Sequence, residues 1–194
     1  MKKIFLLSFF VFFVLSGEVY SQDQHTPENY FIKYSGAGLP ETDSLIVYSK
    51  PGMFKIEEYF SIDGIPYQKI KYLLGKHLTT IDIKPGKKTG KRVDFDKESF
   101  TYIKNSIDPV GIQKYKDYTT HAGEETLLGY PCSVYDNADG SRIWVYDDNH
   151  ILKVFNSIEN TEITAFEFMP DASIDDSIFV IPTDADIHSI YDSK

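Results

Sequence analysis

Residues 125–156, ETLLGYPCSVYDNADGSRIWVYDDNHILKVFN, decide the fold. This stretch holds three short segments rich in β-branched and aromatic residues, separated by two clusters of turn-forming residues. Residues 137–140 end in glycine, which adopts the positive φ that a hairpin turn needs, and 147–149 offer a second turn. The pattern therefore predicts three antiparallel strands, with Trp144 in the middle of the second strand.

The same signals recur on both sides of this stretch. Apolar and polar residues alternate, or apolar β-branched runs occur, at 44–48, 53–60, 68–73, 78–84 and 161–169, which predicts strands. Residues 85–91 (PGKKTGK) read as a solvated hairpin tip, and 29–34 fit either a helical turn or a strand. Residues 96–107 predict a helix with Asp96 as its N-cap, and a short second helix runs to about residue 115. The expected fold class is α+β, mainly β: a curved antiparallel sheet, or half β-barrel, with two or more helices on its concave side.

The two ends of the chain define its organisation. Residues 1–21 combine two lysines, an apolar run and small residues near Ser21, which predicts a signal peptide cleaved before Gln22. Residues 22–194 are then expected to form one exported, periplasmic domain, with no later segment apolar enough to cross a membrane. A net charge of −9 makes the protein a poor partner for nucleic acid, which is itself negatively charged.

The chemistry-bearing residues form no recognisable catalytic or metal motif. No two of the five histidines have the spacing of a metal-ligand pair, so we expect no metal and no cofactor. The only cysteine, Cys132, reads as a small buried hydrophobe. No serine lies in a nucleophile elbow, and the acids Asp82, Asp94 and Asp96 offer only a minor route to a carboxylate-based hydrolase. The sequence therefore indicates a protein that is not an enzyme.

Three segments carry a resemblance to a known group. LLGYPCSVYDNADGSRIWVYDDNHILKVF (127–155), YSKPGMFKIE (48–57) and DDSIFVIPTDADI (175–187) resemble motifs of the LolA/LolB-like exported proteins and related uncharacterised Bacteroidetes-type domains. Lys55 stands where arginine is more usual, and the lipobox of the anchored members is absent. The resemblance implies an incomplete β-barrel capped by helices, with an apolar cavity that carries acyl chains, lipids or lipidated proteins in the cell envelope.

The aromatic and aliphatic residues supply the candidate cavity. We expect the apolar residues of the strands to face the concave side, beneath the helix, while Lys69 and Glu57 face water. The candidate ligand-binding residues are Phe54, Ile56, Phe60, Ile70, Tyr72, Ile81, Ile83, Phe100, Ile103, Ile107 and Trp144. Two alternatives stay open: an interaction or scaffold module whose barrel is filled by its own side chains, and the hydrolase.

Overall fold

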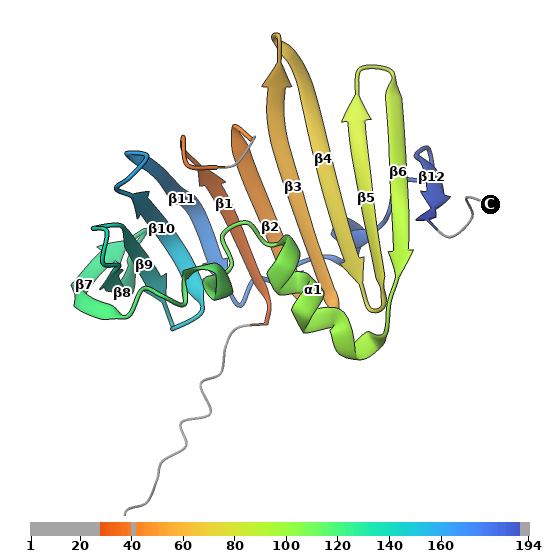
Figure 1. Ribbon diagram of the computed structural model, residues 1–194. Helices are drawn as coiled ribbons and strands as arrows, with labels where there is room; N and C mark the ends of the chain where they lie inside the picture. Colours follow the sequence, from red (N-terminus) through yellow and green to blue (C-terminus); the bar gives the residue numbers. More distant parts are fainter. Residues whose placement is uncertain (1–27, 40–41, 191–194) are drawn as a thin grey trace, which may run out of the picture.

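The computed structural model shows one open sheet of twelve strands with α-helix α1 lying across one face (Figure 1). The structure describes residues 28–39 and 42–190. The expected signal peptide, 1–21, lies outside the described residues. The mainly β class and the antiparallel sheet are confirmed.

The first half of the sheet is an antiparallel meander with tight turns. Its strands are β1 (Tyr30–Ser35), β2 (Ser44–Lys50), β3 (Met53–Ile62), β4 (Ile65–Leu74), β5 (His77–Lys84) and β6 (Lys87–Asp94). Two-residue turns join β2 through β6; at Asp63 and Gly64, for example, φ is positive at both positions, 52° and 77°. The strand alternative for 29–34 is therefore the right one. The hairpin-tip prediction for 85–91 is wrong beyond Gly86, because Lys87 already begins β6.

The second half pairs back onto the first strand of the chain. Strands β7 (Thr120–Leu127), β8 (Tyr130–Asp136), β9 (Arg142–Tyr146), β10 (His150–Asn156) and β11 (Thr161–Pro170) follow in order, and β11 pairs with β1. The three central strands predicted from 125–156 are confirmed as β8, β9 and β10. The register shifts where β11 passes β1, so Ile163, Ala165 and Phe168 are all buried while Phe166 stays 53% exposed.

The helical region is shorter than the sequence suggests. The 3-10 turn η1 (Lys97–Ser99) leads into α1 (Phe100–Ile107), and η2 (Ile112–Tyr115) is a second 3-10 turn. The Asp96 side chain makes no capping hydrogen bond. The expectation of two or more helices is therefore not met in the described residues, which contain one α-helix, since Pro109 follows the end of α1 within two residues.

The C-terminal part of the chain returns behind the sheet. After β11 the chain forms η3 (Asp176–Phe179), which is seen behind β4 and β5 in Figure 1, and ends in β12 (Asp186–Ser189). Strand β12 pairs in parallel with β6, so that Ile187 lies opposite Gly90. Gly90 leaves the space that Ile187 uses, because a Cβ there would lie 3.1 Å from its Cγ1 atom.

The two faces of the sheet carry separate apolar layers. The face under α1, here called the helix face, carries Phe54, Ile56 and Leu73, against which Phe100, Ile103 and Ile107 of α1 pack. The opposite face, here called the tail face, carries a second cluster covered by the C-terminal residues. That cluster contains Ile70, Tyr72, Ile81, Leu74, Ile83, Ile181, Ala185 and Ile187.

The expectation that one apolar set faces the helix is therefore wrong for four residues: Ile70, Tyr72, Ile81 and Ile83 lie on the tail face. The period of two is right within each strand, but the phase changes between strands. Phe54 pairs with Leu73, and Ile70 pairs with Glu57, because a two-residue turn places even-numbered residues of β3 opposite odd-numbered residues of β4. Residues directly opposite in an antiparallel pair share a face, so Glu57 points to the tail face and Lys69 to the helix face.

Candidate functional site

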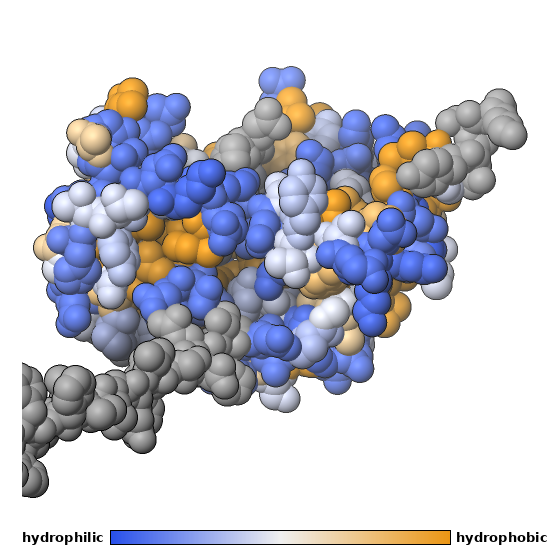
Figure 2. Space-filling model, turned by 60° about the horizontal axis from the view of Figure 1, so that its bottom comes forward, coloured by the Kyte–Doolittle hydropathy of each residue, from blue (hydrophilic) through white to orange (hydrophobic). Residues whose placement is uncertain are grey.

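A row of cavities follows the helix face where the connection from α1 to β7 passes over the sheet. We call residues 108–118 of this connection the strap, and the row of cavities beneath it the groove. The first cavity, of about 360 Å³, lies beside α1, and the second, of about 210 Å³, lies beside η2; both are lined by Ile112. A third, of about 100 Å³, shares Tyr115 and Tyr118 with the second. Figure 2 shows a hollow with an apolar floor and a hydrophilic rim on this lower side of the molecule.

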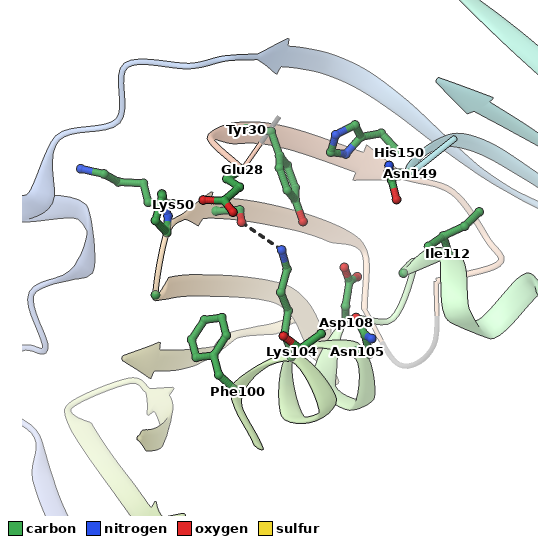
Figure 3. Close-up of a pocket in the computed structure, with 15 residues that line it drawn as sticks. Glu28, Tyr30, Lys50, Phe100, Lys104, Asn105, Asp108, Ile112, Asn149 and His150 are labelled. Carbon is green, nitrogen blue, oxygen red and sulfur yellow. Dashed lines mark hydrogen bonds between the residues drawn. The ribbon is translucent and has the colours of Figure 1, made fainter. Parts of the chain in front are cut away.

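The first cavity has a polar wall built around Lys104 (Figure 3). The ammonium group of Lys104 donates a hydrogen bond of 3.1 Å to Ser49 Oγ, and its Nζ lies 5.1 Å from the ring centroids of both Tyr30 and Phe54. Within the described ranges no carboxylate lies at ion-pair distance from it. Burial lowers the pKa of Lys104, an effect that the charge of Asp108 partly offsets.

Asp108 lies beside Lys104 at the end of α1, and His150 lies across the same cavity from both (Figure 3). Asp108 Oδ1 accepts a 3.0 Å hydrogen bond from the Val110 N–H, and burial raises the pKa of this carboxyl group. His150 is 4% exposed, and its Nε2 has no hydrogen-bond partner in the described part of the chain. Burial, with a smaller contribution from Lys104, lowers the pKa of His150 to about 4, so its imidazole is neutral at pH 7.

The second cavity is mainly aromatic and aliphatic. Its walls come from the strap on one side, and from strands β8 and β9 on the other. Ile143 and Val145 of β9 are buried, while the apolar strap residues are half-buried. The apolar lining residues are Ile112, Tyr115, Tyr118, Tyr135, Ile143 and Val145. A polar cavity and an apolar cavity thus lie next to each other along a single face of the sheet, with Ile112 in the lining of both.

Most of the expected cavity residues are core residues. Phe54 and Ile56 are fully buried, so α1 fills the space above them. Phe60 lies near the far end of the β3–β4 hairpin, where it stacks on Tyr67 at 5.6 Å and lines a separate depression. Of the eleven candidates, only Phe100 lines the cavity beside α1.

The expectation that Trp144 lines the ligand cavity is wrong, because this residue does not lie in the groove. It pairs with Val134 and Lys153, on the opposite side of β9 from Ile143 and Val145. Its Nε1 donates a 2.8 Å hydrogen bond to Glu125 Oε2, and Lys153 Nζ lies 4.8 Å from its ring. Both the polar tip and the ring of Trp144 have structural partners, and the residue is 6% exposed.

Sequence reasoning missed Lys104, Asp108 and His150, although one signal was present for two of them. Phe100, Lys104 and Asp108 follow each other at intervals of four, which places them along one side of a helix. His150 carried no such signal. It lies far from α1 in the sequence, and only the position of β10 within the sheet brings it to the same cavity. The apolar strap residues likewise acquire their role from where the connection lies.

Two of the acids named for the hydrolase alternative lie far apart on the sheet. Asp82 pairs with Thr89 on the helix face, whereas Asp94 pairs with His77 on the tail face, so the sheet does not bring these acids into one cleft. His77 Nδ1 lies 2.6 Å from Asp94 Oδ1 at an exposed edge. Cys132 is 1% exposed, and burial raises the pKa of its thiol, which confirms the prediction of a buried small hydrophobe.

Comparison with known proteins adds little to this geometry. No known family matches the sequence, and no curated protein does so either. An uncharacterised conserved protein from Thermus thermophilus has a TM-score of 0.49 at 12% identity, over 84% of this chain and 91% of that chain. PNGF-II has a TM-score of 0.44 at 10% identity over 84% of this chain, which spans only 31% of the PNGF-II chain. MucB has a TM-score of 0.36 at 12% identity, over 83% of this chain and 60% of that chain.

None of these TM-scores reaches 0.5, so no property of those proteins is transferred to this chain. Separately, in the part of the chain that the structure describes, no helix has the length and apolar character needed to cross a membrane.

Proposed function

We propose that the protein is an exported, non-enzymatic binding protein that holds a hydrophobic ligand with an acyl chain, free or as part of a lipid or lipidated protein, in the groove of the helix face. The observation that carries this proposal is the row of neighbouring cavities between the strap and the helix face of the sheet, with an apolar section lined by Ile112, Ile143 and Val145. Ligand sites are typically concave and largely apolar, with a few polar groups that fix orientation.

The arrangement of the cavities favours this proposal over a self-filled scaffold. Two cavities of about 360 and 210 Å³ lie side by side beneath the strap and share Ile112, which gives one elongated ligand room along a single face of the sheet. The resemblance of 127–155 to the LolA/LolB-like group and the predicted signal peptide support an envelope location and an acyl ligand.

A fluorescent fatty-acid analogue titrated into the purified protein tests the proposal. We expect saturable binding that palmitate displaces, and loss of that binding in Ile112→Trp, whose indole would fill the junction of the first two cavities. Ile158→Trp is the matched control, because Ile158 is 78% exposed at the β10–β11 turn and lines none of the three cavities of the groove. Absence of binding in the wild-type protein, or equal loss in both variants, would contradict the proposal.

A further inference from the structure

The polar cavity beside α1 lies at one end of the groove, next to the apolar section, and Ile112 lines both. A ligand that extends along both cavities must therefore have one polar end and one apolar end. The chemistry of the polar wall then decides which kind of polar end fits.

The polar wall is rich in groups that donate hydrogen bonds. Lys104 offers N–H groups beyond the one given to Ser49, and the hydroxyl groups of Ser49 and Tyr30 also line the cavity. His150 Nε2, buried and without a partner in the described residues, donates in one of the two neutral tautomers. A cation and several donors around a cavity are suited to an oxyanion.

The charges around the cavity also favour an acidic ligand. Four charged side chains line it: Lys104, Lys50, Asp108 and Glu28. Lys50 is engaged with Asp176 and with the Ile174 carbonyl, and Glu28 is exposed at the rim. Asp108 already accepts from the Val110 N–H, whereas Lys104 has only the neutral Ser49 hydroxyl as acceptor among the described residues. A cation taken out of water without an anion is costly, and a ligand carboxylate would compensate it.

The raised pKa of Asp108 also favours an acidic ligand in this cavity. Because burial favours the neutral carboxyl form, Asp108 opposes an incoming anion less than an exposed aspartate would.

Building on the proposed function, we propose that the groove selects a free fatty acid, with its carboxylate in the cavity beside α1 against Lys104, Ser49 and His150 and its alkyl chain along Ile112 into the apolar section. The carboxylate supplies the anion at ion-pair distance that Lys104 lacks within the described residues. The selectivity is thus for the acid over its ester, at equal chain length.

The test compares palmitate with methyl palmitate by displacement of the fluorescent probe. We expect wild-type protein to prefer palmitate by about tenfold or more, since a charge-assisted hydrogen bond is roughly twice as strong as a neutral one. Lys104→Met should remove this preference, because it weakens binding of palmitate more than binding of the methyl ester, whereas Lys104→Arg should retain it. Lys114→Met, an exposed lysine of η2, is the matched control.

Each result separates the two proposals. Equal affinity of wild-type protein for acid and ester, or a preference that survives in Lys104→Met, would overturn the fatty-acid inference while leaving the acyl groove in place. Binding of neither compound to the wild-type protein would overturn both. The wild-type preference needs no variant, so it decides the question even if Lys104→Met does not fold.

Discussion

The helix face and the tail face are two sides of the same strands, yet they are covered differently. On the helix face a short helix and the strap cover the sheet and leave a groove. On the tail face the C-terminal residues cover Ile70 and Ile81, and beside them lies a buried ion pair between Lys55 and Glu57. Alternation along a strand therefore defines two faces, whereas the segments that cross each face decide which one has room for a ligand.

The buried ion pair shows how the tail face accommodates charge. Lys55 Nζ lies 2.6 Å from Glu57 Oε1, with side-chain exposures of 9% and 12%. Lys55 also lies over the rings of Tyr48 and Tyr72, and the Tyr59 hydroxyl donates to Glu57. Burial, and then the Glu57 charge, raise the pKa of Tyr72 to about 12. Tyrosines therefore surround this pair. Lys104 on the other face differs, because no carboxylate among the described residues lies at ion-pair distance from it.

The largest effect is expected from removing the centre of the helix face. Phe54→Ala should lower the free energy of unfolding by about 3–5 kcal/mol, because Phe54 is fully buried beneath α1. Urea unfolding measures this, with Phe166→Ala as the control, since Phe166 is 53% exposed. Similar losses of unfolding free energy from both substitutions would show that α1 does not cover this part of the sheet.

On the tail face, Glu57→Gln should cost about 3 kcal/mol, because it leaves the Lys55 ammonium buried without its anion. The double variant Lys55→Met/Glu57→Met should regain most of that loss. The surface pair Lys33–Glu167, with exposures of 31% and 42%, is the matched control, and Glu167→Gln should cost about 0–1 kcal/mol. An equal loss of unfolding free energy in Glu57→Gln and Glu167→Gln would show that the Lys55–Glu57 pair is exposed to solvent.

The pH dependence of stability should reveal the neutral histidine of the helix face. The folded pKa of His150, about 4, lies below its ordinary value of 6.5, so the unfolded chain binds more protons between these values. Stability should be fully present above pH 6.5 and fall by up to about 3 kcal/mol as the pH drops to 4. His150→Gln should flatten this slope in denaturant titrations, and His121→Gln, at an exposed position, should not. An unchanged slope in His150→Gln would contradict the burial of this imidazole.

A smaller effect is expected at the edge of the tail face. Ile187→Ala should cost about 1–2 kcal/mol, because Ile187 is half-buried over Gly90. Hydrogen exchange should accelerate in β12 and β6 while binding of the fatty-acid analogue stays unchanged. Weakened ligand binding would show that the two faces are coupled.

The sequence predicts the strands well but misplaces two of them in phase. Alternation in 68–73 and 78–84 correctly separates apolar from polar residues, and the turn at Asp63 and Gly64 contains the missing information. A two-residue turn fixes which residues of β3 and β4 lie opposite each other, so the turn signal alone is sufficient to assign Ile70 to the face of Glu57.

The candidate site was less predictable for a physical reason. The spacing of Phe100, Lys104 and Asp108 indicates one helix side, but nothing local places His150 opposite them. The end of α1 and the course of the strap over β9 depend on long-range packing, which local propensity does not encode. The sequence also contains no sign that Lys55 is buried. Its charge predicts exposure, and the tyrosines that surround the Lys55–Glu57 pair come from three different strands.

The difference between the two faces can be measured most directly with isoleucine methyl groups. An NMR titration of palmitate into protein labelled at isoleucine methyls reports on both faces at once. We predict shifts at Ile112 and Ile143, which line the groove, and none at Ile70, Ile81 and Ile187 on the tail face. Shifts confined to the tail-face isoleucines, or no shift at any methyl, would contradict an acyl-binding groove on the helix face.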